Sequence, residues 1–154
     1  MHEIDLALTR LGLTWPEPPR PVASYVRAVR TGNLLFVSGQ LPLREGALLR
    51  TGKVPSKVSV ADAQTAAAQC ALNALAIVRA ELGGDLTKLV RVVRLGVFVQ
   101  CDEGFADQAK VANGASDLLV SLLGEKGRHA RAAVGTHALP LDAPVEVEMI
   151  VEVA

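Results

Sequence analysis

The stretch Arg128–Ala154, with the sequence RHARAAVGTHALPLDAPVEVEMIVEVA, decides the fold of this chain. Its last part alternates between apolar and mostly acidic positions, and the apolar ones are Val145, Val147, Met149, Val151 and Val153. Successive side chains of a strand point to opposite faces, so this pattern predicts a strand with one apolar and one polar face. Arg131 opens the preceding apolar segment, and Glu146 lies near the start of the predicted strand. A guanidinium and a carboxylate in such positions are candidates for binding a small molecule.

The residues upstream predict two helices and further strands. Residues 25–41 are typical of a β-hairpin, and Val90–Val99 is a strongly apolar strand pattern. Helices are predicted over Ser59–Leu82, with Ser59 as its cap, and over Phe105–Leu123, with Asp102 as its cap. This order predicts an α+β fold in which a single mixed sheet has two helices packed on one face. The other face, which carries the glutamates, then meets water or another subunit.

Composition narrows the classes of function. Sixteen basic and sixteen acidic residues balance, and the aromatic residues number only five (Trp, Tyr and three Phe). This leaves little basic surface or stacking area, which disfavours nucleic acid as a partner and ribonuclease activity. The longest helical candidate contains Asp62, Arg79 and Glu81, so no membrane span is expected. The N-terminal residues lack a signal-peptide pattern, and a cytoplasmic location with reduced Cys70 and Cys101 is the expectation.

The spacing of the histidines and cysteines does not match that of metal ligands. His129 and His137 lie eight residues apart without a carboxylate at ligand spacing, and His2 is terminal. No metal is therefore expected. Residues 3–13 predict a short amphipathic helix that is followed by a proline-rich connector, so residues 1–21 are expected to form an extension to a domain spanning 22–154.

Several segments carry a resemblance to a known family. They are YVRAV (25–29), GNLLFVSGQ (32–40), RAAV (131–134), LP (139–140) and EVE (146–148). In this order they resemble the RidA family, also called the YjgF/YER057c/UK114 family, of which the chain looks like a divergent side branch. The resemblance implies a chorismate-mutase-like fold and a homotrimer with clefts between subunits. It also implies hydrolysis of 2-imino and enamine acids to 2-keto acids and ammonia, as in 2-iminobutanoate/2-iminopropanoate deaminases, without a metal or organic cofactor.

The resemblance also assigns roles to individual residues. Arg131 looks like the arginine that holds the substrate carboxylate, and its planar fork of donors suits a bidentate contact. Glu146 looks like the carboxylate that orients or activates water. The remaining substrate-binding residues implied are Tyr25, Ser38, Gly39, Asn113 and Ala133. Ala133 stands where many members have cysteine, and the span from Phe105 to Arg131 is longer than in the common pattern.

The spacing of Arg131 and Glu146 constrains the site. If the last two strands formed a simple hairpin, Arg131 would lie opposite Glu152, roughly 20 Å along the strand from Glu146. Either these strands are not neighbours, or another chain supplies one group. On pattern alone, Arg131 is a solvated strand arginine and the glutamates are a polar strand face. A non-catalytic trimeric module that binds small carboxylates or a partner protein is the alternative to an enzyme.

Overall fold

The computed structural model describes residues 2–20 and 24–154. Its main elements, in chain order, are α1 (Glu3–Arg10), β1 (Ala28–Thr31), β2 (Leu34–Gln40), β3 (Leu43–Arg44), β4 (Ala47–Leu48), α2 (Val60–Glu81), β5 (Leu89–Gln100), α3 (Gln108–Leu123), β6 (Ala130–Thr136) and β7 (Val145–Val153). Short 3-10 turns, η1 (Leu86–Lys88), η2 (Gly124–Gly127) and η3 (Pro140–Asp142), precede the last three strands.

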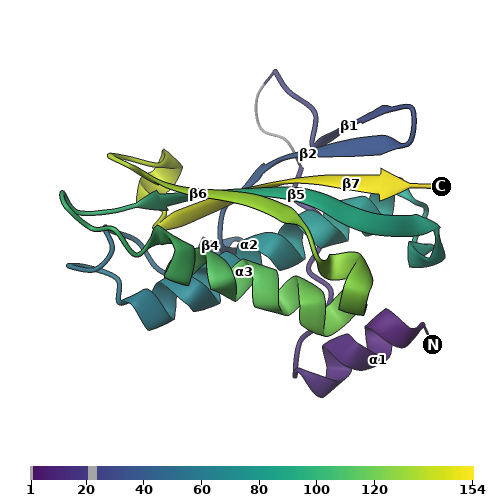
Figure 1. The fold of residues 1–154 in the computed structure, drawn as a ribbon, viewed down its shortest axis with the longest axis horizontal. Helices are drawn as coiled ribbons and strands as arrows, with labels where there is room; N and C mark the ends of the chain where they lie inside the picture. Colours follow the sequence, from purple (N-terminus) through teal and green to yellow (C-terminus); the bar gives the residue numbers. More distant parts are fainter. Residues whose placement is uncertain (1, 21–23) are drawn as a thin grey trace.

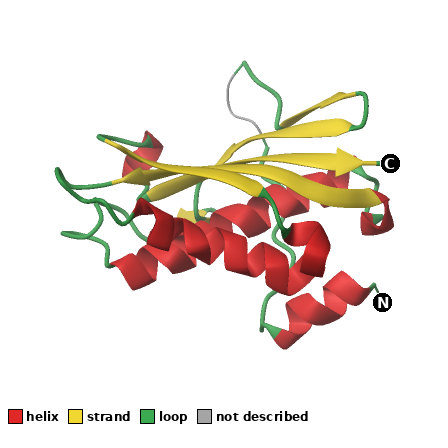
Figure 2. Cartoon of the chain, viewed as in Figure 1, coloured by secondary structure: helices red, strands yellow, loops and turns green. Residues whose placement is uncertain are grey.

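Five strands form the main sheet in the order β1-β2-β7-β5-β6, and β3 and β4 form a separate small hairpin. The β5–β6 pair is parallel and the other pairs are antiparallel, so the sheet is mixed. Helices α2 and α3 cover one face of the sheet, and α1 lies outside them (Figure 1). No long helix of the described chain covers the opposite face (Figure 2). The predicted α+β architecture is confirmed.

Strand β7 occupies the middle of the sheet and follows the predicted alternation. Val145, Val147, Met149, Val151 and Val153 are buried beneath the helices. Glu146, Glu148 and Glu152 are on the other face, where they are only partly buried. Strand β5 lies between β6 and β7, so the last two strands are not neighbours. The first of the two alternatives raised by the spacing of Arg131 and Glu146, that their strands are not neighbours, is therefore correct.

The two long helices differ in how well their starts were predicted. Ser59 caps α2 as expected, because its hydroxyl accepts a hydrogen bond from the amide of Asp62 at 3.0 Å. The predicted cap at Asp102 is wrong. The carboxylate of Asp102 instead accepts hydrogen bonds from the backbone and hydroxyl of Ser56, both at 2.9 Å, and α3 begins only at Gln108. A bend at Gly104, where φ is +82°, separates Asp102 from the helix.

The N-terminal extension packs against the helices. Helix α1 ends at Arg10, which is earlier than the predicted 3–13. The indole of Trp15 donates a hydrogen bond to Asp5 at 2.8 Å, and the guanidinium of Arg79 on α2 lies 5.4 Å from the centre of the Trp15 ring. Residues 21–23, where the expected boundary between extension and domain falls, lie outside the described residues. None of the described helices is both long and apolar enough to cross a membrane.

The close approach of α2 and α3 depends on Gly114. A Cβ atom at this position would lie 2.6 Å from the carbonyl carbon and 2.7 Å from the Cα atom of Gln64. Gly114→Ala is therefore expected to force the two helix backbones apart and to cost about 1–3 kcal/mol of unfolding free energy. Thermal unfolding should show a melting temperature about 2–4 °C lower per kcal/mol. The control is Asp117→Ala on the exposed side of the same helix, and an unchanged melting temperature for Gly114→Ala would contradict the close contact.

Candidate active site

Arg131 lies on β6, the edge strand of the sheet. It is paired with buried Leu95, so its side chain is on the helix-covered face. Its Nη1 donates to Oδ1 of Asn113 at 2.9 Å and to Oγ of Ser116 at 3.1 Å, and its Nη2 donates to the carbonyl of Ala109 at 3.5 Å. A guanidinium has five N–H donors. Three are used here, which leaves two for a ligand.

Ser116 and His129 orient Arg131 through a directional chain of hydrogen bonds. Nδ1 of His129 contacts the carbonyl of Gly127, which only accepts, so this nitrogen carries the hydrogen. In the neutral ring Nε2 then accepts from the hydroxyl of Ser116 at 2.9 Å. The same hydroxyl oxygen accepts from Arg131. Burial lowers the pKa of His129, and the charge of Arg131 lowers this pKa further, which favours the neutral ring.

Glu146 lies on the opposite face of the sheet, directly over Gly39. A Cβ atom at Gly39 would collide with Oε1 of Glu146 and would lie 2.9 Å from its Cδ, so the carboxylate needs glycine there. The register of β2 against β7 shifts between Val37 and Gln40, which places a bulge at this point. The resemblance implied Gly39 and Glu146 separately, and the structure brings them together.

The environment of Glu146 favours the protonated form of its carboxyl group. Its side chain is half-buried, and it has no ion pair or hydrogen bond within residues 2–20 and 24–154. Burial raises the pKa of Glu146, and the nearby charge of Glu148 raises it further. Glu148 itself is paired with Arg94 at 3.2 Å. A raised pKa makes the carboxylate of Glu146 a stronger base than an ordinary glutamate, so it suits a group that takes a proton and returns it.

Ser38, Tyr25 and Ala133 complete the set of predicted residues. The hydroxyl of Ser38 donates to the carbonyl of Val26 at 2.7 Å, which holds the segment before β1 against the bulge. Tyr25 precedes this contact, and it is 51% exposed. Ala133 is two residues after Arg131 and packs partly against the core. Ser38 is next to Gly39 and so lies near Glu146, and Tyr25 is next to the Val26 carbonyl that Ser38 contacts. Asn113 contacts Arg131 directly, and Ala133 follows Arg131 on the same strand.

The two groups of residues do not form one site within a single chain. Arg131 is level with Leu95 of β5, and Glu146 is level with Phe98. Two strand spacings and three residues of rise put their backbones roughly 14 Å apart. Their side chains also point to opposite faces of the sheet. One small acid therefore cannot contact both groups of the same chain.

Ser116 and His129 were not predicted as site residues. From the sequence, a metal-ligand role for His129 was not expected, and no group of three or more metal-binding side chains is found among the described residues. The available signal was the spacing of Asn113 and Ser116, which puts both on one face of a helix. Without the position of β6 beside α3, that spacing does not indicate a contact with Arg131.

Comparison with known proteins defines the class. The family model described as Endoribonuclease L-PSP matches residues 16–153. The chain therefore belongs to this family, which is the RidA (YjgF) family that its motifs resemble. Protein TCP17 from Trypanosoma cruzi is 46% identical, with 94% of this chain and 91% of the relative covered. The crystal structure of Atu1372, a protein of unknown function from Agrobacterium tumefaciens, is 50% identical with a TM-score of 0.91 and covers 98% of this chain and 93% of that chain.

One relative has a name that describes an activity. A 2-iminobutanoate/2-iminopropanoate deaminase from Dermatophagoides farinae is 29% identical over 90% of this chain and 93% of its own length. The family thus includes imine deaminases.

Proposed function

We propose that the protein hydrolyses reactive 2-imino acids to 2-keto acids and ammonia in clefts between copies of the chain. Arg131 of one copy binds the substrate carboxylate, and Glu146 of a neighbouring copy accepts and donates the protons of the reaction. One observation carries this proposal. Arg131 has donors to spare and Glu146 has no partner among the residues that the structure describes, and the two lie on opposite faces of one sheet. The named deaminase among the relatives supports the same activity.

The chemistry requires water and a proton carrier. The carboxylate of Glu146 takes a proton from a water molecule as the water oxygen attacks the imine carbon, and the resulting carboxyl group returns this proton to the imine nitrogen, which gives a carbinolamine. Glu146 then takes the hydroxyl proton and delivers it to the amino nitrogen, so that the C–N bond breaks, the C=O bond forms and the nitrogen departs as ammonia. Arg131 fixes the carboxylate so that the electrophilic carbon faces the water. An imine is already reactive, so positioning and proton transfer supply the catalysis.

A second copy has surfaces on which to bind. Strand β6 is at the edge of the sheet, so half of its backbone hydrogen-bonding groups lack a strand partner in the described chain. The helix-free face also carries three exposed apolar side chains, Val29, Phe36 and Val134, which are 54%, 41% and 48% exposed. Apolar surface of this kind favours association. The family resemblance makes a homotrimer the proposed assembly.

Release of keto acid from 2-aminoacrylate tests the activity. A dehydratase generates the imine from serine, and formation of pyruvate is followed with and without the protein. The protein is expected to accelerate pyruvate release over spontaneous hydrolysis, and Arg131→Ala is expected to lose that acceleration. Arg128→Ala, which removes an exposed arginine three residues away, is the matched control. Saturable binding of a keto acid without acceleration would instead identify a binding module.

Ser116→Ala is expected to weaken substrate binding more than turnover. The variant removes one of the hydrogen bonds that orient Arg131 and leaves Nε2 of His129 without its donor. A hydrogen bond to a charged group is worth about 1.5–3 kcal/mol, so KM should rise about tenfold or more with a smaller change in kcat. Ser116→Thr retains the hydroxyl and should restore KM. A positioning role would be contradicted if both variants showed the same fall in kcat and the same rise in KM.

A further inference from the structure

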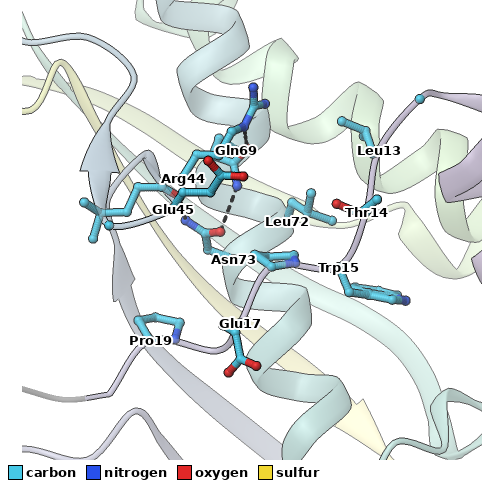
Figure 3. Close-up of a pocket in the computed structure, with 14 residues that line it drawn as sticks. Leu13, Thr14, Trp15, Glu17, Pro19, Arg44, Glu45, Gln69, Leu72 and Asn73 are labelled. Atoms are coloured by element: carbon cyan, nitrogen blue, oxygen red, sulfur yellow. Dashed lines mark hydrogen bonds between the residues drawn. The ribbon is translucent and has the colours of Figure 1, made fainter.

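A second cavity lies on the side of the molecule where the N-terminal connector crosses α2. Its walls are the connector from Gly12 to Pro19, the turn of the β3–β4 hairpin, and buried residues of α2 beneath them (Figure 3). Its volume is about 530 Å³, which is in the range of small-molecule sites. None of the residues assigned above to imine hydrolysis lines it.

Arg44 is held in this cavity by two buried amides. Its Nε donates to Oε1 of Gln69 at 3.1 Å, and Nε2 of Gln69 donates to Oδ1 of Asn73 at 2.9 Å. Asn73 in turn donates to the carbonyls of Leu41 and Leu43 at 3.1 and 2.9 Å. Gln69 and Asn73 are only 5% and 3% exposed. Figure 3 shows this chain of side chains running along α2. Each amide has one orientation that satisfies its partners, so the chain fixes the guanidinium.

The fixed guanidinium retains unused donors. Nη1 and Nη2 of Arg44 have no acceptor among the described residues, and one hydrogen of the Gln69 amide is also free. Arg44 and Gln69 both line the cavity. A planar guanidinium with both terminal nitrogens free binds a carboxylate through two parallel hydrogen bonds.

The cavity also contains two carboxylates, Glu17 on the connector and Glu45 beside Arg44. Neither forms an ion pair within the described ranges. One guanidinium and two carboxylates give the cavity a net negative charge, which disfavours a phosphate dianion and favours a ligand with a positive group as well as a negative one. Arg44 and Glu45 are consecutive residues at the hairpin turn, where Glu45 has φ of +52°. Because both residues line the same cavity, their opposite charges suit a ligand with its carboxylate and ammonium on one carbon.

We propose that this cavity binds an apolar α-amino acid. The carboxylate lies on Arg44, the ammonium lies on Glu45, and the aliphatic side chain packs against Leu13, Leu43 and Leu72. This site is separate from the proposed imine hydrolysis and does not depend on it.

Binding of L-leucine to the full chain tests the proposal. Titration calorimetry measures affinity, and the fluorescence of Trp15, the single tryptophan of the chain, reports from the cavity wall. Saturable binding at millimolar or lower concentration is expected. Arg44→Gln and Glu45→Gln should each weaken it about 10- to 100-fold, because each removes a hydrogen bond to a charged group. Arg50→Gln, a surface arginine paired with Asp62, is the matched control and should leave the affinity unchanged.

Analogues of leucine decide the ligand class. The acid without the ammonium, 4-methylpentanoate, and the amine without the carboxylate, 3-methylbutylamine, should both bind more weakly than leucine. Arg131→Ala should bind leucine normally, which separates this site from the cleft. Absence of saturable binding to the unmodified protein, equal binding of 4-methylpentanoate, or unchanged affinity in Arg44→Gln would each overturn the assignment.

Discussion

Two inactive variants, Arg131→Gln and Glu146→Gln, are expected to recover imine hydrolysis when they are co-assembled. Arg131 and Glu146 of one chain lie on opposite faces of the sheet, with β5 between their strands. Each proposed cleft therefore takes its guanidinium from one copy and its carboxylate from the next. A cleft that combines the intact Arg131 of one variant with the intact Glu146 of the other is complete.

The recovered fraction follows from random mixing. In a closed ring assembled from equal amounts of the two variants, each cleft has a chance of one half for each intact group, so about a quarter of the clefts are complete. Unfolding and refolding the variants together should yield about a quarter of the unmodified activity. Mixing the folded variants briefly, before subunits exchange, is the control and should give none. If the refolded mixture also stays inactive, a cleft that combines Arg131 of one copy with Glu146 of another is excluded.

The strands with the strongest alternation were the best predicted from sequence. In β7 every second residue is buried beneath the helices, because the sheet has one covered and one uncovered face. The turn between β1 and β2 and the cap at Ser59 were also predictable, because both depend on residues adjacent in the chain. Asp102 failed as a cap because Ser56, which is distant in sequence, binds its carboxylate.

The site could not be predicted to the same extent because β6 carries no readable alternation. Its sequence ARAAVGT has small residues on both faces, and none of its side chains is fully buried. Whether Arg131 points toward the helices or away from them depends on its parallel register with β5. The hydrogen bonds that link Arg131 to Ser116 and Ser116 to His129 depend on the same register. The role of each residue came from the family resemblance, whereas its face of the sheet came only from the structure.

Glu146→Gln is expected to remove activity without destabilising the fold. Loss of the proton carrier should lower kcat about 10²- to 10⁴-fold. Burial and the charge of Glu148 raise the pKa of Glu146 above the ordinary value of 4.5, so the folded chain binds its proton more tightly than the unfolded chain. The free energy of unfolding therefore falls as pH rises from 4.5 through the raised pKa of Glu146. Above the raised pKa this loss of stability is complete. Glutamine is neutral at every pH and carries no such penalty.

Melting temperatures of the unmodified protein and Glu146→Gln, measured across pH, test this coupling. The variant should gain stability relative to the unmodified protein toward neutral pH, and this gain should vanish below pH 4.5. Activity of the unmodified protein should fall as pH drops through the raised pKa, because the protonated carboxyl cannot accept a proton from water. Glu152→Gln, on the same face of β7 but outside the site, should keep full activity. A Glu146→Gln variant that is less stable at neutral pH would contradict this coupling. It would show that the carboxylate stabilises the fold at the bulge around Gly39.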